Sequence, residues 1–441
     1  MRRRTESIER PLSGRSAIGG CGSAVHLDRR NWMGAAAAFG VAGWLTPVSS
    51  LLARQADSPR RRGPAKSVIV LWLQGGASQL ETFDPKPGAA VGGPTRAIAT
   101  SVPGLAIAEH LPSIAERMDR LCVVRNLKSP EGDHDRGNRY LHTGFVPVPA
   151  FPRPSLGSLV SHAWGAKSAG SAPEIPAFVS LGGSNGNPAF LGPDHAPLMI
   201  DDPAATARLI GELRSRRRRL TLLDDMNRDY AATQVATGLD RRRTTLERIG
   251  RILDTSFGQA LDVERAPAAD RARYGEGGFA DRCLTARRLL ESGVRFVEVA
   301  HGGWDTHGDN FAQVARLAGE IDRPWAALLD DLQASGLWDE TLVVWMGEFG
   351  RTPQINGDNG RDHFPDVTPV VLGGGGLKRG IVLGASADDG NAIDGATVTV
   401  PDLFATLLTA LGRDPYETLQ TDFGSPAEVT EGGKPIAELL A

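Results

Sequence analysis

Short apolar runs recur along the chain, and each of them predicts a buried strand. Residues 67–73 read SVIVLWL, which is apolar on both faces of an extended chain and is followed by Gln74-Gly75-Gly76. A continuous β-branched run bounded by glycines is typical of a strand buried within a parallel sheet. Similar runs occupy residues 121–124, 294–299, 341–346, 367–372 and 381–383. The sequence therefore predicts a sheet built from these runs.

Helical periodicity lies between several of the runs. Apolar residues at helical spacing occupy residues 114–118, 280–291, 311–332 and 402–411. Gly293, Gly336 and Gly412 follow three of these segments, where glycine commonly ends a helix. The alternation of strands and helices predicts an α/β fold with a doubly wound, mostly parallel sheet over residues 66–441.

Residues 201–280 differ from the rest of this predicted domain. They contain no long β-run, and we expect a helical insertion that covers one edge of the sheet. Arginines cluster at residues 216–219 and 241–243, which indicates either a solvated helix face or an anion site.

The first 56 residues read as an export signal. Arg29 and Arg30 precede an Ala/Gly-rich apolar stretch, and small and polar residues follow it. This layout resembles a twin-arginine signal, although an amphipathic helix that begins with two arginines would give the same pattern. Residues 57–65 are predicted to be a linker. We therefore expect recognition by the twin-arginine export machinery and a periplasmic or other extracytoplasmic location.

Charge and composition narrow the possible functions. Of the 441 residues, 41% are hydrophobic and 23% are charged, which is ordinary for a globular protein. Eleven arginines and four acidic residues give the segment up to Arg62 a charge of +7, so the remainder carries −10. An acidic body argues against nucleic acid as the main partner. No apolar run reaches about 18 residues, so we expect no stable membrane span.

Polar side chains follow the predicted strands, at the edge of the sheet where the strands end. Ligands bind at this edge of an open parallel sheet, because the loops after neighbouring strands meet there. The candidate residues in these loops are Gln74, Asp133, His134, Asp135, Asp305, His307, Glu348, Arg351, Arg361 and His363. Histidine and carboxylate without cysteine form a ligand set for zinc, manganese or a similar divalent cation.

Four of the candidates are predicted to bind a metal ion. Asp305 and His307 lie two residues apart in a Gly-flanked loop, so both can reach one divalent ion, whether zinc, manganese or calcium. Glu348 and His363 are expected to complete its ligands. Two other pairings stay open: Glu348 with Arg351, and Asp362 with Arg361 or with His363, which it would orient.

The other candidates are expected to serve catalysis and substrate binding. His134, between Asp133 and Asp135, is predicted to act as a general base or as a direct nucleophile. Arg351 or Arg361 is expected to clamp the oxygens of an anionic substrate, because a guanidinium binds such oxygens two at a time. Gln74 is expected to contact the substrate as well.

Several longer segments together resemble one bacterial family. The segments are SVIVLWLQGGASQLETFDPKPG, YLHTG, GGWDTHGDNF, TLVVWMGEFGRTP, GRDHFP and DLFATLLTALG, and the resemblance covers nearly all of residues 66–412. The family is catalogued as domain of unknown function 1501 and is placed in the alkaline phosphatase/sulfatase superfamily. The resemblance implies a fold of that type and hydrolysis of phosphate or sulfate esters with one or two metal ions.

The resemblance also implies places for the site residues. Superfamily enzymes carry a Ser, Thr or Cys nucleophile at the start of a helix that often ends in Thr-Gly, which Thr143-Gly144 matches. Counting back places the nucleophile near His134, and the nearest hydroxyl is Ser129. Asp305, His307 and His363 stand where the superfamily keeps metal ligands. Gln74 to Gly76 replace an aspartate ligand after the first strand, and Glu348-Phe349 replaces an Asp-His pair.

Two main hypotheses follow for function. The first is an exported, metal-dependent hydrolase of sulfate or phosphate esters, whose partner is an anionic small molecule or a sulfated or phosphorylated glycan. The second is a non-catalytic relative that binds such a glycan, or a protein, through the same cleft, because the hydroxyl nucleophile is missing and a fold does not determine function. A purely structural envelope protein is a third reading.

Overall fold

The computed structural model describes residues 63–165, 175–183, 186–215, 257–421 and 423–441. The predicted export signal over residues 1–56, most of the predicted linker and both arginine clusters lie outside these ranges. Within them, none of the helices combines the length and the apolar character that crossing a membrane requires.

The described chain forms a nine-stranded sheet. In spatial order the strands are β12 (Ile381–Leu383), β4 (Leu121–Lys128), β11 (Thr368–Gly374), β8 (Thr341–Met346), β1 (Ser67–Leu73), β7 (Phe296–His301), β5 (Phe178–Leu181) and β6 (Leu198–Ile200), and β15 (Val398–Thr399) also pairs with β4. All six predicted runs are strands of this sheet. Strands β5, β6 and β15 are not among the predicted runs, because strands of two to four residues give only a weak pattern in the sequence.

Strand β11 runs antiparallel to both of its neighbours, β4 and β8. The other pairings in the sheet are parallel, so the predicted mostly parallel sheet is confirmed. The expectation that residues 367–372 form a parallel strand is wrong, because a strand buried on both faces reads the same in either direction. As a result, the carboxyl ends of β1, β4, β7 and β8 and the amino end of β11 share one edge of the sheet.

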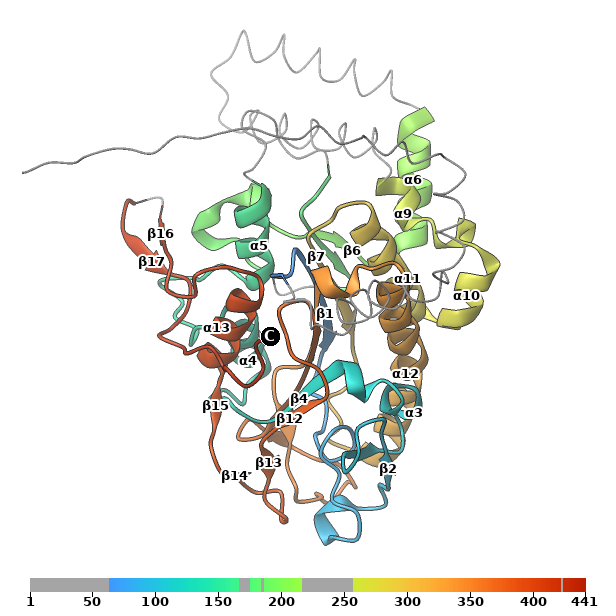
Figure 1. Ribbon diagram of the computed structural model, residues 1–441, viewed down its shortest axis with the longest axis vertical. Coiled ribbons are helices and arrows are strands. Elements are labelled where there is room, and N and C mark those ends of the chain that lie inside the picture. The colour runs from blue at the N-terminus through green and yellow to red at the C-terminus, as the bar shows by residue number, and fades with distance from the viewer. Residues whose placement is uncertain (1–62, 166–174, 184–185, 216–256, 422) are drawn as a thin grey trace, which may run out of the picture. The chain divides into compact units, whose positions relative to one another are not determined.

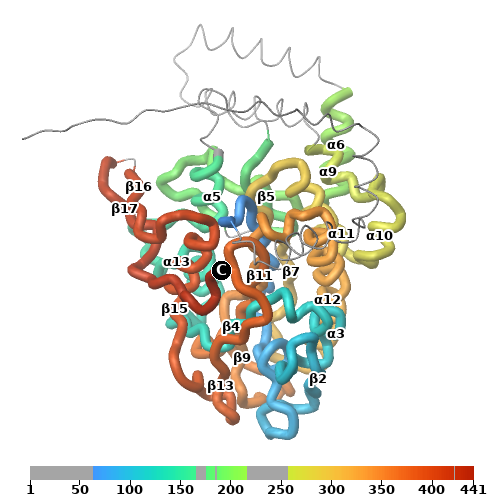
Figure 2. Tube along the Cα trace, in the orientation of Figure 1, coloured from blue at the N-terminus to red at the C-terminus, as the bar shows by residue number. Residues whose placement is uncertain are grey.

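Helices cover both faces of the sheet (Figures 1 and 2). They are α3 (Pro112–Ala115), α4 (His134–Thr143), α5 (Leu156–Gly165), α6 (Pro203–Ser215), α9 (Phe257–Leu261), α10 (Ala268–Tyr274), α11 (Gly278–Glu291), α12 (Asn310–Ala334) and α13 (Val400–Ala410). Helices α6, α9 and α10 belong to the predicted insertion over residues 201–280, whose described parts are mainly helical.

Alternate residues of the central strand β1 build two separate cores. Ile69 and Leu71 belong to the core that includes α11 and α12, whereas Val68 and Val70 belong to the core that includes α4, α5 and α13. All four side chains are at most 2% exposed. The strand is therefore apolar on both faces because both faces are covered by helices.

In the part of the chain that the structure describes, four two-stranded ribbons lie outside the large sheet. They pair β2 (Ala97–Ala99) with β3 (Ala106–Ala108), β9 (Gly350–Arg351) with β10 (His363–Phe364), β13 (Ala385–Ser386) with β14 (Ile393–Asp394), and β16 (Thr418–Gln420) with β17 (Pro426–Glu428). The ribbon of β9 and β10 matters most for the site, since it pairs Arg351 with His363 in an antiparallel register.

A buried ion pair anchors the loop that leads into β10. Arg361 donates to Glu81, in the loop after β1, at 2.7 Å, and neither side chain is exposed. The same guanidinium donates to the carbonyl oxygens of Thr352, Pro353 and Val91. The pair thus links the loop after β1 to the loop that leads into β10, near the edge of the sheet where β1 and β8 end.

Replacing Glu81 with Ala is expected to lower the free energy of unfolding by about 3–5 kcal/mol, because it leaves a buried guanidinium without its counter-charge. Urea unfolding measures this change. The matched control is Lys66→Ala, which removes the solvent-exposed pair with Glu340 and is expected to change stability little. A Glu81→Ala protein as stable as the control variant would contradict the role given to the buried pair.

Candidate functional site

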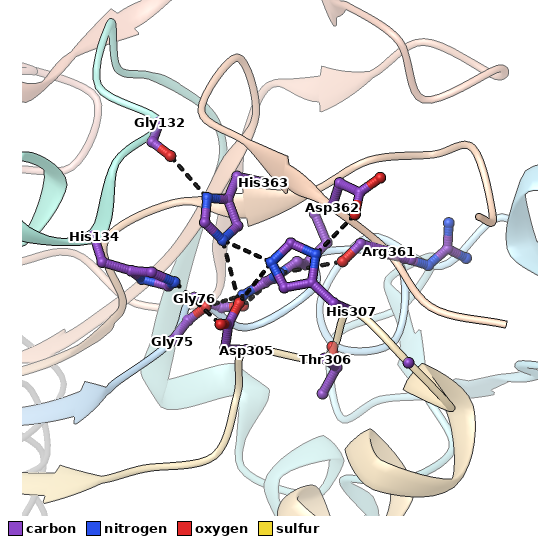
Figure 3. Close-up of polar contacts among 12 residues, drawn as sticks. Gly75, Gly76, Gly132, His134, Asp305, Thr306, His307, Arg361, Asp362 and His363 are labelled. Carbon is purple, nitrogen blue, oxygen red and sulfur yellow. Dashed lines mark hydrogen bonds and ion pairs between the residues drawn. The ribbon is translucent and has the colours of Figure 1, made fainter. Parts of the chain in front are cut away.

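Four of the predicted residues meet at one point above the carboxyl edge of the sheet (Figure 3). His134 is the first residue of α4, Asp305 and His307 lie in the loop after β7, and His363 begins β10. His134, Asp305 and His363 place possible ligand atoms within 4.8 Å of one another. The sheet therefore brings together residues that are more than 200 positions apart, as the strand-end pattern predicts.

One atom each of Asp305, His307 and His363 form a small triangle. Nε2 of His307 lies 3.1 Å from Oδ1 of Asp305, and Nε2 of His363 lies 3.2 Å from the same oxygen. The two Nε2 atoms are 2.9 Å apart. Ligands about 2.0–2.1 Å from a tetrahedral zinc ion lie about 3.3 Å from one another, so the triangle has the size of one face of such a site.

The outer nitrogens of the two imidazoles identify the atoms that face the triangle. Nδ1 of His307 lies 2.7 Å from a carboxylate oxygen of Asp362, and Nδ1 of His363 lies 2.8 Å from the carbonyl oxygen of Gly132. A carbonyl or carboxylate oxygen accepts hydrogen bonds, so both Nδ1 atoms carry the proton of the neutral ring. Both Nε2 atoms then direct their lone pairs toward Oδ1 of Asp305. A cation between these three atoms would be bound by all of them. Metal-bound histidines commonly show this outer hydrogen bond.

Arg351 holds Asp305 in place from below. Its Nη2 donates to Oδ1 of Asp305 at 2.6 Å, and its other donors bind the backbone carbonyls of Gly75, Gly76 and Arg361. The Arg351 side chain is fully buried. Partial burial alone would raise the pKa of Asp305, but the hydrogen bond and charge of Arg351, with the nearby histidines, lower it to about 2. The contacts assign Arg351 to Asp305, and neither the predicted substrate clamp nor the pairing with Glu348 fits them.

His134 joins the triangle to a buried carboxylate. Its Nε2 lies 3.3 Å from Oδ2 of Asp305, and its Nδ1 lies 2.8 Å from Oε1 of Glu348. The hydrogen bond to Glu348 raises the pKa of His134 above its usual value, against an opposing effect of partial burial. Glu348 is fully buried and also accepts the backbone N–H of Gly75 at 2.8 Å. The hydrogen bonds of Oε1 therefore join it to His134 and Gly75, and not to the triangle of Asp305, His307 and His363.

The remaining predicted site residues lie outside this group. Asp133 caps α4 by accepting the Arg136 amide at 3.1 Å, and Asp135 is exposed and pairs with Arg139. Gln74 is exposed, and its backbone bonds with the loop after β7. Burial of Arg361 against Glu81 argues against its predicted contact with substrate.

Backbone geometry explains why glycines follow β1. Gly75 has a φ of +111°, and a Cβ there would collide with the backbone nitrogen of Asp305. The end of β1 therefore contributes close backbone contact and an N–H for Glu348, and no metal ligand. This is the physical basis of the Gln-Gly-Gly sequence at that place.

Comparison with known families now adds to the geometry. The model of a family described as "Protein of unknown function (DUF1501)" matches residues 65–440. The chain belongs to the DUF1501 family. The resemblance drawn from the motifs is thereby confirmed at the level of the family. A search of curated protein sequences found no match.

Several solved structures are similar to this DUF1501 protein. One is a protein in the alkaline phosphatase superfamily from Vibrio parahaemolyticus, with 12% identity and a TM-score of 0.41 over 85% of this chain and 71% of that one. Another is the PsFucS1 sulfatase from Pseudoalteromonas sp., with 15% identity and a TM-score of 0.37 over 83% and 70%. A third is the alkaline phosphatase from the Antarctic bacterium TAB5, with 14% identity and a TM-score of 0.38 over 80% and 99%.

A second histidine–carboxylate pair, which the residue patterns did not reveal, lies at the other end of α4. His142 and Glu298 of β7 are both buried, with Nε2 of His142 3.1 Å from a carboxylate oxygen. Nδ1 of His142 donates to the Asn138 carbonyl at 2.7 Å. Burial alone would lower the pKa of His142, but the charge and hydrogen bond of Glu298 outweigh it, so the pKa is raised. The pair fixes the last turn of the helix that begins with His134.

The stability contributed by this pair is expected to depend on pH. Because the pKa of His142 in the folded DUF1501 protein lies above its unfolded value of about 6.5, the contribution is complete below about pH 6.5. It is lost as the pH rises through the folded pKa. The difference in unfolding free energy between the wild type and His142→Gln is therefore expected to shrink as the pH rises above about 6.5 and through the folded pKa of His142. Urea unfolding across this range measures it, and a difference that grows with pH would contradict the assignment.

Proposed function

We propose that this protein is a metal-dependent hydrolase of sulfate or phosphate esters. Asp305, His307 and His363 hold one divalent cation in this proposal. The observation that carries it is the convergence of two imidazole lone pairs and a carboxylate oxygen, with both outer imidazole nitrogens already bonded to oxygen acceptors. Two nitrogen ligands favour zinc or manganese over calcium, which prefers oxygen.

The chemistry of the site follows from where His134 stands. A divalent cation held by Asp305, His307 and His363 would polarise the ester and would lower the pKa of a nearby water molecule toward about 7. Nδ1 of His134 is occupied by Glu348, so Nε2 is the atom that faces Asp305 and the substrate side. We assign His134 the role of general base, which takes the proton of the attacking water at Nε2 and returns it to the leaving oxygen.

The missing hydroxyl nucleophile supports this single-step scheme. The superfamily pattern places the nucleophile at the start of α4, and His134 is the first residue of that helix. Ser129, the nearest hydroxyl in the sequence, is buried and accepts the amide of Glu131 at 3.1 Å. A water molecule activated next to His134 therefore replaces the side-chain nucleophile in our proposal.

The same motifs support the substrate class and the location. The family resemblance favours an anionic small molecule or a sulfated or phosphorylated glycan. Arg29 and Arg30 favour transport through the twin-arginine route before the protein acts outside the cytoplasm.

Metal removal is expected to abolish turnover. Treatment with a chelator should stop hydrolysis of p-nitrophenyl sulfate and p-nitrophenyl phosphate, and zinc or manganese should restore it. His307→Ala should lower bound metal, measured by elemental analysis, and should reduce kcat/KM by at least about 100-fold. The control is His162→Gln, which changes a half-buried histidine outside the proposed site. This variant should keep the bound metal and the kcat/KM of the wild type.

Two results would separate the alternatives for the site. Equal turnover by the metal-free protein would contradict metal-dependent hydrolysis. Bound metal with no turnover across a broad ester panel, together with saturable binding of a sulfated glycan, would instead support the non-catalytic hypothesis.

Export is expected to depend on the two arginines. Replacing Arg29 and Arg30 together with Lys should leave the protein in the cytoplasm of a host with a working twin-arginine pathway. Fractionation of the cells measures the distribution. Unchanged export of the double variant would contradict the twin-arginine assignment.

A further inference from the structure

Glu348 is a buried carboxylate with an unusual set of partners. It lies two residues beyond the end of β8 and is fully buried. Oε1 accepts both of its hydrogen bonds, one from the Gly75 N–H and one from Nδ1 of His134. Its second oxygen, Oε2, is buried and has no hydrogen-bond partner. A buried carboxylate that is only half satisfied costs stability, which indicates that it is kept for the site.

The packing around Glu348 and His134 leaves the imidazole little freedom. Helix α4 lies directly against the acid, since a Cβ at Gly137 would be 3.3 Å from Cβ of Glu348. The His134 ring has the Phe349 ring at a centroid distance of 5.0 Å and the His363 ring at 4.4 Å. The rings therefore limit the tilt of the imidazole, and Oε1 of Glu348 limits its rotation.

We infer that Glu348 is a positioning residue for His134 and is not the fourth metal ligand that the sequence pattern suggests. This inference rests on the proposed function. Two carboxylates face the ring of His134: Oε1 of Glu348 lies 2.8 Å from Nδ1, and Oδ2 of Asp305 lies 3.3 Å from Nε2. Because a carboxylate oxygen only accepts hydrogen bonds and the contact with Glu348 is the shorter one, Glu348 places the ring proton of neutral His134 on Nδ1. The lone pair then lies on Nε2, which is the ring atom next to Asp305. The wrong tautomer would present an N–H to the attacking water and could not accept its proton.

The two roles for Glu348 differ in what its removal does. A metal ligand lost from the site lowers bound metal. Removal of a positioning residue leaves the ligand atoms of Asp305, His307 and His363 in place. It changes the state of His134 and frees the backbone N–H of Gly75. Metal content and the tautomer of His134 are therefore independent readouts, and neither of them requires that a substrate be known.

The test uses Glu348→Ala and Glu348→Gln in the full-length, exported protein. The matched control is Glu298→Gln, which alters the other buried carboxylate that contacts a histidine of α4, but at the far end of that helix. Elemental analysis measures bound zinc. The ¹⁵N chemical shifts of histidine side chains at about pH 8, assigned with His134→Gln, measure the tautomer of neutral His134.

We expect both Glu348 variants to keep wild-type zinc content. In Glu348→Ala, His134 should lose its uniform Nδ1–H tautomer. Its kcat on p-nitrophenyl sulfate or p-nitrophenyl phosphate should fall by about 100-fold with little change in KM. Glu348→Gln keeps an amide oxygen near Nδ1, so it should retain the tautomer and lose less activity. Glu298→Gln should leave the His134 signals unchanged.

Loss of zinc in both Glu348 variants would overturn the inference and make Glu348 a metal ligand. An unchanged His134 tautomer in Glu348→Ala would overturn it as well. If Glu348→Ala does not fold, Glu348→Gln still decides between the roles, because a metal ligand changed to an amide loses affinity for zinc. A wild-type protein that hydrolyses no ester would contradict the proposed function, while the zinc and tautomer measurements would still decide the role of Glu348.

Discussion

The proposed site depends on one carboxylate, Asp305, and on the charge that holds it. Its Oδ1 lies within 3.2 Å of Arg351, His307 and His363, and its Oδ2 lies 3.3 Å from His134. Arg351 is buried and donates to backbone carbonyls as well, so it cannot turn away from Asp305. The buried guanidinium of Arg351 thus fixes the carboxylate of Asp305. The three histidines of the site are all placed around that carboxylate.

Sheet topology brings these groups to Asp305. Four parallel strands end at the same edge, and the antiparallel strand β11 begins there. A loop that leaves β8 can therefore return along this edge and place His363 before entering β11. If β11 ran parallel to β8, the chain would have to cross to the opposite edge first, and His363 would lie far from Asp305. The buried ion pair of Arg361 with Glu81 holds this loop down.

Much of the fold and part of the site follow from the sequence alone. Six apolar runs predict six strands, and the rule that loops meet at strand ends brings His134, Asp305, His307 and His363 together correctly. The direction of β11 does not follow, because an apolar run carries no sign of its direction. Arg361 and Arg351 cannot be told from exposed arginines by residue type, since burial is a property of the folded chain. The carbonyl of Gly132 and the partner of His142 on β7 are tertiary contacts, which no local pattern records.

Anomalous X-ray diffraction can show whether Oδ1 of Asp305 and the Nε2 atoms of His307 and His363 bind one cation. Crystals grown with zinc, with data collected on both sides of the zinc absorption edge, locate the ion without reference to activity. We expect one anomalous peak about 2.0–2.2 Å from Oδ1 of Asp305 and from Nε2 of His307 and His363. A peak coordinated by Glu348, or a triangle without zinc in crystals that bind zinc elsewhere, would contradict it.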